Sequence, residues 1–361
     1  MPKGPTTTPP FGRPSPATAG TTGVVTAGPV VLAAVVVVAG WGYLPADWTI
    51  LHGAGRDLLA GHLTVYVRHP DAQVGPLALV LSALPRPLFT ALVCALMLSL
   101  TLTGRRLGIP DRAILVGGSV AAIPWGVQAL GGHIDDPLVV TGAAVMILGL
   151  RQHRPDKVGW GFVLALAGKP TGVVLAPLLL TAGWPAIGVA VAGVATVWGP
   201  FVLADLGGFL RAGQGVVWVE PWSLPFVLGE PAGAAFPEWV RPVQLVGGLA
   251  GCWLVARRNG PVSAAVAALA FRAVLEPGAW PSYSVCVIAL TLLLPTRRGQ
   301  STSLAAFSWL VGWLLIAQPN AVTGVLHAGL LMALILLSIH RSPVPALATQ
   351  DALEERLTSS R

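Results

Sequence analysis

Charged side chains are scarce in this sequence. Asp, Glu, Lys and Arg make up 10% of its 361 residues, whereas ordinary soluble domains carry about 25%. Hydrophobic residues make up 54%, and the mean hydropathy is +0.73. This balance excludes a typical soluble domain and indicates an integral membrane protein. The net charge of +7 therefore has to be interpreted through membrane topology, and we expect no nucleic-acid partner.

Cysteine and the common catalytic motifs are also rare or missing. The three cysteines, Cys94, Cys252 and Cys286, all fall in apolar runs, which suits buried or lipid-facing thiols better than a disulfide framework. The sequence contains no G-x-x-x-x-G-K-[ST], G-x-S-x-G or H-E-x-x-H motif. These absences argue against a nucleotide-binding P-loop, a hydrolase nucleophile and a zinc protease. We expect no metal site and no cofactor.

Long apolar runs are what the sequence does contain. A straight transmembrane helix needs about 20 apolar residues, so these runs predict an all-α polytopic membrane protein of about 12 segments, some of them short. Two neighbouring runs separated by "GKP" are too short to span and are interpreted as half-helices. The predicted segments are 24–44, 88–103, 113–130, 137–150, 160–168, 171–183, 186–204, 242–256, 261–276, 282–295, 303–317 and 322–340.

The basic residues orient these segments. If the segments alternate, most Lys and Arg residues, including those in "GRRLGIPDR", "RQHRPDK", "ARRNG" and "TRRG", share one side with both termini. The positive-inside rule makes that side cytoplasmic. We expect a cytoplasmic tail at 1–22, a membrane domain at 23–341 with outer loops at 45–87 and 205–241, and a cytoplasmic tail at 342–361. The protein is then a multi-pass cell-membrane protein with any active site on the extracytoplasmic side.

The motif "GGHIDDP", at positions 131–137, places an acidic pair between two apolar runs at the outer face. Asp135 and Asp136 can cap the helix over 137–150, with Pro137 as its first residue. They can also line a cavity and bind acceptor hydroxyls. A divalent cation held together with His133 is a weaker possibility, because further oxygen ligands are lacking. We expect one Asp to cap the helix and the other to belong to a site.

The first outer loop contains "DWTILHGAGRDLLAGHLTVY". Its apolar residues Trp48, Leu51, Leu58 and Leu59 recur at helical spacing with polar residues between them. This pattern predicts an amphipathic helix that lies in the membrane interface.

Three stretches resemble a known class of membrane enzymes. The loop "PADWTILHGAGRDLLAGHLTVYVRHPDAQVGPLALVLSALP", the helix pair "GWGFVLALAGKPTGVVLAPLLL" and the late segment "FRAVLEPGAWPSYSVCVIALTLLL" are similar to parts of GT-C glycosyltransferases. The likeness is to the actinobacterial polyprenol-phosphate-mannose-dependent mannosyltransferases. This chain has Val74–Pro76 where many members have Tyr-Pro-Pro, and Leu51 where an aromatic residue is common.

The resemblance implies a catalytic base at Asp47, because the family's base lies just outside the first transmembrane helix. The alternative from the residues alone is that Asp47 caps the amphipathic helix, since Asp is favoured at that position. Asp71, in "RHPDAQ", is the second acid candidate, or a turn residue after Pro70. His133, Asp135, Asp136 and Glu276 complete the candidates for an acceptor site or a second acid.

Cationic groups are needed to stabilise a phosphate leaving group. Lys169 lies between the two half-helices, where a charge is costly and indicates function. Its alternative is snorkelling to the outer headgroups. Arg272 is a second phosphate candidate, although Glu276 is placed four residues on for an ion pair within one helix. Arg211, in the second outer loop, is a third candidate.

The expected function is transfer of mannose, or another hexose or pentose, from a polyprenyl-phosphate donor. The acceptor is a cell-envelope glycolipid or glycan at the outer face, and the anomeric carbon is inverted. A transporter or lipid flippase is the first alternative; it calls for polar groups at the bilayer midplane and two symmetric halves. A non-catalytic GT-C-like assembly protein is the second, because the two family aromatic positions noted above are missing.

Overall fold

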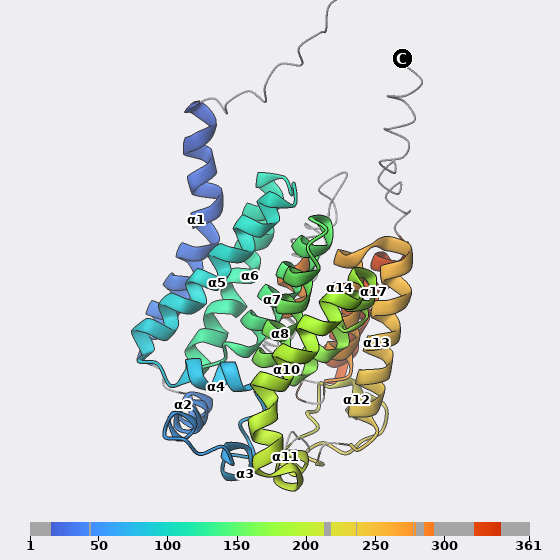
Figure 1. The fold of residues 1–361 in the computed structure, drawn as a ribbon. Coiled ribbons are helices and arrows are strands. Elements are labelled where there is room, and N and C mark those ends of the chain that lie inside the picture. The colour runs from blue at the N-terminus through green and yellow to red at the C-terminus, as the bar shows by residue number, and fades with distance from the viewer. Residues whose placement is uncertain are drawn as a thin grey trace, which may run out of the picture.

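The structure is a computed structural model that describes residues 16–42, 45–212, 218–235, 237–276, 278, 285–291 and 321–340. Every regular element in these ranges is a helix, so the predicted all-α class is confirmed for them (Figure 1). The predicted segment 303–317 and most of both tails lie outside the described residues. The predicted count of about 12 spans and the cytoplasmic placement of both termini stay predictions.

In the part of the chain that the structure describes, nine helices form the bundle, and several sequence neighbours pack against each other. α7 packs along α8, α1 along α6, and α13 along α14. Most begin close to the predicted apolar runs, but the first helix starts at Pro16 and not at Val24. The nine are α1 (Pro16–Ala39), α5 (Arg86–Arg106), α6 (Asp111–Gly131), α7 (Asp135–Arg151), α8 (Pro155–Gly168), α10 (Trp184–Ala204), α13 (Val240–Asn259), α14 (Pro261–Val274) and α17 (Ala321–His340).

Among the described residues, three helices are long and apolar enough to cross a membrane. They are α5, α6 and α10, each 21 residues long. At 1.5 Å per residue, such a helix is about 30 Å long, the thickness of the bilayer's hydrocarbon core. The protein is therefore compatible with a helical membrane protein.

The "GKP" break forms as predicted. α8 ends at Gly168, and Lys169 is extended, with φ −151° and ψ 134°. Pro170 explains this, because proline disfavours the helical conformation at the residue before it and has no N–H of its own. The chain continues as a short 3-10 helix, η1 (Pro170–Leu175), and then as α9 (Pro177–Ala182).

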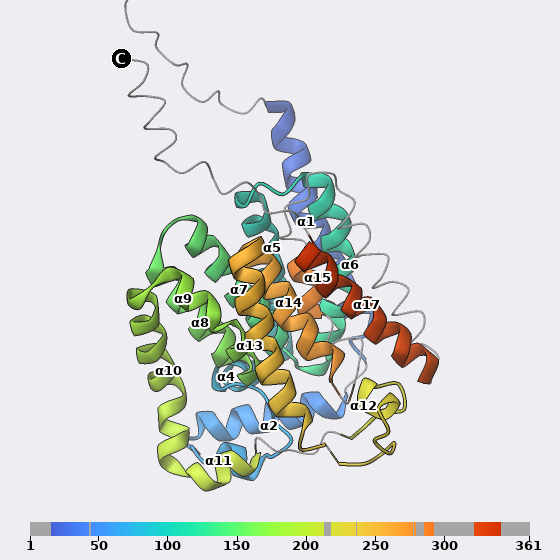
Figure 2. The ribbon, with the colours of Figure 1, turned by 90° about the vertical axis from the view of Figure 1, so that its right-hand side faces the viewer.

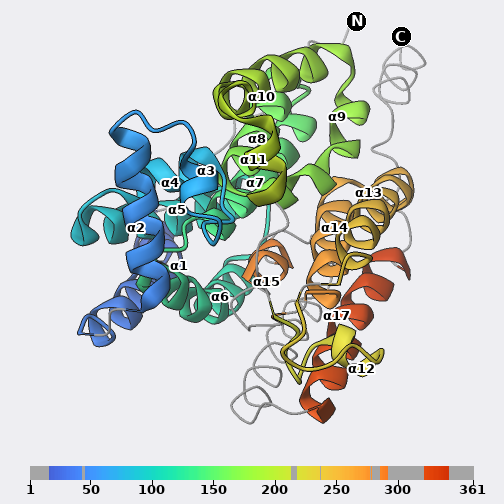
Figure 3. The same ribbon diagram turned by 90° about the horizontal axis from the view of Figure 1, so that it is seen from below.

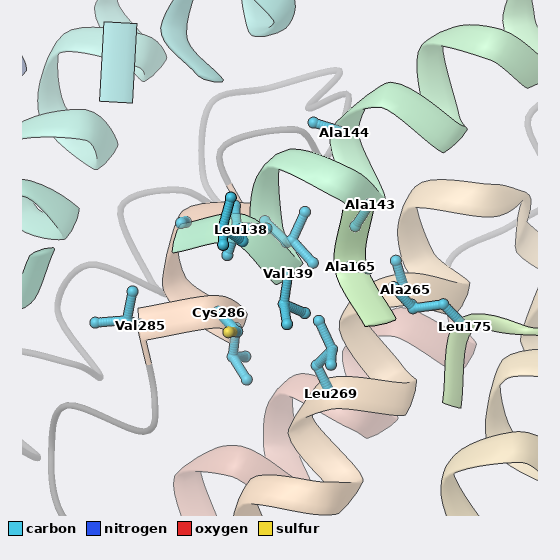
Figure 4. Packing of buried hydrophobic residues seen from close by; sticks show 14 of the residues in the cluster. Leu138, Val139, Ala143, Ala144, Ala165, Leu175, Ala265, Leu269, Val285 and Cys286 are labelled. Atoms are coloured by element: carbon cyan, nitrogen blue, oxygen red, sulfur yellow. The ribbon is translucent and has the colours of Figure 1, made fainter. Parts of the chain in front are cut away.

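The core beside this break is tightly packed. A Cβ built on Gly142 of α7 would lie 2.5 Å from the Gly161 carbonyl oxygen, and one on Gly161 of α8 would lie 2.7 Å from the Gly142 carbonyl oxygen. Only glycine allows this approach, as is common where membrane helices pack. Figure 4 shows Leu138 and Val139 of α7, Leu269 of α14 and Cys286 of α15 (Val285–Thr291) among the packed side chains of this core.

Short helices cover one end of the bundle, and basic residues mark the other. α2 (Ala46–Leu59), α3 (Val65–Arg68), α4 (Pro76–Ser82), α11 (Leu206–Ala212) and α12 (Leu224–Val227) lie at the covered end (Figures 1 and 2). The connections α5–α6, α7–α8 and α13–α14 lie at the opposite end (Figure 1). Basic residues adjoin them: Arg105 in the last turn of α5, Arg154 before α8 and Arg258 in the last turn of α13. Positions 45–87 and the basic connections thus lie at opposite ends, as the charge pattern predicts.

α2 is the predicted amphipathic helix and lies across the covered end (Figure 3). Trp48 and Leu51 are buried within the protein, and Leu59 is exposed. The helix ends at Leu59, and the buried stripe runs instead through Ala54 and Gly55 toward α4. A Cβ on Gly55 would lie 2.2 Å from the Leu79 carbonyl oxygen, so α2 and α4 are in backbone contact there.

Candidate functional site

A cavity of about 730 Å³ opens at the end of the bundle that α2 covers. Its wall combines residues of α2, the α6–α7 connection, the "GKP" break, α10, α11 and α13. Seven of the nine site residues predicted from the sequence line it: Asp47, Asp71, His133, Asp135, Lys169, Arg272 and Glu276. These positions are far apart in the sequence, so the fold brings them together.

Asp47 lies in the first turn of α2 and does not cap it. Pro45 occupies the N-cap position, and the helix has no side-chain cap hydrogen bond. The Asp47 side chain is 62% exposed, and its Oδ2 lies 3.3 Å from His133 Nε2. The capping interpretation of Asp47 is therefore wrong, because the helix starts at Ala46, two residues earlier than that interpretation requires. The carboxylate is left facing the cavity.

His133 lies in the short connection between α6 and α7, positions 132–134. Its Nε2 faces Asp47, and its Nδ1 lies 3.2 Å from Asp135 Oδ1. Burial opposes a charge on the ring, but the hydrogen bonds to Asp135 and Asp47 outweigh it and raise the pKa of His133 to about 9. The same hydrogen bond from His133 lowers the pKa of Asp47. At neutral pH this contact is an ion pair.

Lys169 is buried between two carboxylates. Its Nζ lies 2.6 Å from Asp135 Oδ2 and 2.9 Å from Asp136 Oδ1, and all three side chains are at most 8% exposed. The snorkelling interpretation is wrong, because the extended Lys169 backbone turns the side chain into the bundle toward α7. A buried charge must be compensated, and the acidic pair of "GGHIDDP" compensates this one.

The acidic pair does not cap α7 through its side chains. Ile134 is the N-cap residue, and no side-chain cap hydrogen bond forms. Asp136 instead accepts a hydrogen bond from Gln128 Nε2 at 3.1 Å in addition to its contact with Lys169. The expectation that one Asp caps the helix is therefore wrong. Both carboxylates lie in the first turn, where the helix dipole still favours negative charge.

A second polar group forms the opposite part of the wall. Arg272 and Glu276 make the expected i,i+4 ion pair at 2.9 Å, and both are buried. Gln244 of α13 donates to Glu276 Oε2 at 3.4 Å and to the Arg272 carbonyl at 3.1 Å. Arg241 donates to Gln244 Oε1 and to Gln73 Oε1. Arg241 and Arg272 both line the cavity.

Aromatic rings form the apolar side of the cavity. Tyr66 stacks on Trp198 with ring centroids 5.8 Å apart, and Phe209 packs edge-on against both rings. The Tyr66 hydroxyl donates to the Val74 carbonyl at 3.0 Å. Val74 begins the "VGP" stretch that differs from the resembled family, so this stretch is held by the aromatic cluster.

The remaining predicted site residues lie apart from these contacts. Asp71 is exposed in the turn after Pro70 and lines the cavity rim, so the turn interpretation agrees with the structure. Asp136 does not line the cavity, but it contacts Lys169, which does. Arg211 lies in α11, but its side chain is outside what the structure describes.

Sequence reasoning did not place Gln73, Gln244, Tyr66 or Trp198 in the site. Tyr66 ends the amphipathic stretch, and Gln244 is a polar residue in an apolar run, which is the signal that singled out Lys169. No cluster of three or more His, Cys, Asp or Glu side chains with metal-binding geometry occurs in the part of the chain that the structure describes.

The sequence matches no protein-family model, and it matches no curated protein. The function must therefore be argued from the cavity itself.

Proposed function

We propose that this chain is an inverting, GT-C-like glycosyltransferase that takes a sugar from a polyprenyl-phosphate donor and acts in the cavity beneath α2. The observation that supports this proposal is that an acid and two cations line the same cavity. The Asp47 carboxylate faces a cavity of about 730 Å³ that Arg241 and Arg272 also line. A transfer of this kind needs one acid for the acceptor and cations for the leaving phosphate.

In the proposed reaction, the acceptor hydroxyl oxygen attacks the anomeric carbon as the bond from that carbon to the phosphate oxygen breaks. Asp47 takes the hydroxyl proton, and the polyprenyl phosphate leaves with the bonding electron pair. The lowered pKa of Asp47 keeps the carboxylate ionised at neutral pH. It also makes Asp47 a weak base, which suits a step in which the proton leaves late, as in an oxocarbenium-like transition state.

Arg241 and Arg272 are better placed than Lys169 to bind the donor phosphate. Lys169 already contacts two carboxylates at 2.6 Å and 2.9 Å, so its charge is neutralised within the wall. Arg241 donates hydrogen bonds to the amide oxygens of Gln73 and Gln244 and lines the cavity. A guanidinium can grip a phosphate with two parallel hydrogen bonds. We assign the donor phosphate to Arg241 and Arg272, which line the cavity. A guanidinium has five N–H donors, so Arg272 can keep its 2.9 Å ion pair with Glu276 while it binds a phosphate oxygen.

The test is transfer by the purified chain in lipid nanodiscs. The donors are synthetic polyprenyl-phospho-mannose and matched hexose and pentose analogues, and the acceptor is a membrane glycolipid fraction. We expect transfer from one donor, with the product's anomeric configuration opposite to the donor's. Folded protein that transfers nothing from any donor in the panel contradicts the proposal.

A second candidate function is favoured by the buried charges. The chain of groups from Asp47 through His133 and Asp135 to Lys169 runs from an exposed side chain into the bundle. Ionisable chains of this kind also serve proton-coupled transporters. Proteoliposomes with a trapped pH dye distinguish the two: a transporter dissipates an imposed proton gradient when substrate is added, and a transferase does not.

A further inference from the structure

The imidazole of His133 is held between two carboxylates. Its Nε2 lies 3.3 Å from Asp47 Oδ2, and its Nδ1 lies 3.2 Å from Asp135 Oδ1. A neutral imidazole has one donor nitrogen and one acceptor nitrogen. In that state one of the two contacts would set a lone pair against a carboxylate oxygen. Only the imidazolium, with two N–H donors, satisfies both carboxylates at once.

The two carboxylates are held very differently. Asp135 is 1% exposed, and Lys169 Nζ lies 2.6 Å from its Oδ2. Lys169 is in turn bound to Asp136, which accepts from Gln128. Asp47, by contrast, is 62% exposed and makes no helix-capping bond. His133 therefore connects a fixed carboxylate in the bundle with an otherwise solvated one at the cavity.

The backbone beside His133 explains how the ring reaches α2. Gly132 adopts φ +80°, a conformation that favours glycine, and a Cβ there would lie 3.1 Å from Trp48 Cε3. The Gly132 carbonyl accepts from Ser82 Oγ at 3.2 Å, and the His133 N–H donates to the Gln128 carbonyl at 2.9 Å. The "GGH" part of the motif thus lets α2 approach closely and turns the ring toward Asp47.

We infer that His133 is a positioning residue for the proposed reaction: as an imidazolium backed by Asp135, it orients the Asp47 carboxylate toward the cavity and keeps it ionised. This role rests on the proposed function, whereas the ion pair itself does not. The charged groups that face the ring are Asp47 from α2, Asp135 from α7 and Lys169 from the break after α8. The two acids favour the ring's charge, and Lys169 opposes it.

The inference predicts the direction of a pH effect. The pKa of His133 is raised to about 9, so the imidazolium is present at neutral pH and is lost as the pH rises through about 9. Transfer by the wild type should therefore fall above that pH. In His133→Gln the alkaline fall should disappear, because no group is left to lose its charge there. The acid limb of kcat/KM should move to higher pH in that variant, because Asp47 loses the hydrogen bond that lowers its pKa.

The experiment has two independent readouts on the full chain in nanodiscs. The first is an NMR titration of ¹⁵N-labelled histidine in the wild type and in Asp47→Asn. We expect a His133 signal that titrates near pH 9 and moves to lower pH in Asp47→Asn. A ring that titrates near 6.5, its ordinary value, and ignores Asp47→Asn overturns the inference even if the wild type transfers sugar.

The second readout is the pH dependence of transfer for the wild type, His133→Gln and His133→Lys. We expect His133→Gln to lower kcat about 10²-fold, the usual cost of misplacing a reacting group by roughly 1 Å, with KM near the wild-type value. His133→Lys restores a charge and should recover part of the loss. His69→Gln is the matched control, because His69 bonds to Asp57 away from the cavity.

The outcomes separate the two proposals. A wild-type kcat and alkaline limb in His133→Gln overturn the inference and leave the transferase in place. A wild type that transfers nothing, with a His133 signal near pH 9, overturns both the transferase and the positioning role, while the ion pair stands.

Discussion

Two clusters of acidic and basic side chains, one buried and one exposed, show how burial changes the meaning of the same residue types. The buried cluster consists of Lys169, Asp135 and Asp136, whose side chains are at most 8% exposed. His133 links this cluster to the exposed Asp47 of α2. The exposed cluster consists of Asp57, Arg68 and His69, with contacts of 3.3 Å and 3.0 Å between side chains that are 27% to 47% exposed.

The two clusters should contribute differently to the free energy of unfolding. Exposed ion pairs contribute about 0–1 kcal/mol because solvent screens them. Removing one partner of a buried pair costs about 3–5 kcal/mol because it leaves an uncompensated charge. The buried cluster should therefore be sensitive to every change in charge and the exposed cluster to almost none. Variants of the two clusters should therefore differ in stability and in activity.

The largest effect should come from Lys169→Met. It leaves Asp135 and Asp136 adjacent, buried and without their shared cation, so we expect unfolding to become easier by about 3–5 kcal/mol. Denaturant unfolding in mild detergent measures this. The control is a triple variant that adds Asp135→Asn and Asp136→Asn, which removes the charges together and should recover much of the loss. A stable single variant would contradict the assigned role of Lys169.

Gly132→Ala should have the next largest effect. A side chain at φ +80° is strained by about 1–2 kcal/mol, and its Cβ would meet Trp48 at 3.1 Å. Gly53→Ala is the matched control on α2, because a Cβ there meets nothing within 4 Å. Alanine is favoured over glycine in helices by about 1 kcal/mol, so Gly53→Ala should leave stability equal or higher. Equal thermal stability for both variants would show that α2 does not depend on this close approach.

High pH should have a smaller effect on stability. The folded-state pKa of His133 is raised to about 9 from 6.5, so its stabilisation is complete below pH 6.5 and is lost as the pH rises through about 9. The loss is moderate because the Asp47 side chain is largely exposed and solvent screens the pair. Melting temperatures between pH 6 and pH 10 measure it. The wild type should lose more stability over this range than His133→Gln, and identical curves would argue against the ion pair.

The smallest effect should come from the exposed cluster. His69→Gln removes one contact to Asp57, whose side chain is 37% exposed, so stability should change by no more than about 0.5 kcal/mol. Transfer should be unchanged, because His69 does not line the cavity. A large loss in either measurement would remove the distinction between the two clusters.

The sequence predicted most of the helices but fewer of the contacts. Apolar runs marked the long helices because hydrophobic periodicity is a local signal, and "GKP" predicted the break because proline acts on its immediate neighbour. The helix ends were less accurate: Asp47, Asp135 and Asp136 were each given a possible capping role, but Pro45 and Ile134 hold those positions.

Contacts between site residues that are distant in the sequence could not be predicted from local sequence patterns. Lys169 was identified as functional because a charge in an apolar run is costly, yet its partners are 33 and 34 residues away in the sequence. The i,i+4 pair of Arg272 and Glu276 was predicted because both partners share one helix face. Gln244 and Tyr66 were missed because a single amide or hydroxyl acquires meaning only through the neighbours that the fold supplies.

The most direct test of the central claim compares Asp47→Asn with Asp57→Asn in the sugar-transfer assay. Both changes remove a carboxylate of α2 that contacts a histidine, and both keep the side-chain shape. If Asp47 is the base, Asp47→Asn should lower kcat by roughly 10²–10⁴-fold, while Asp57→Asn should transfer at the wild-type rate. Full transfer by Asp47→Asn, or an equal loss in both variants, would contradict the account.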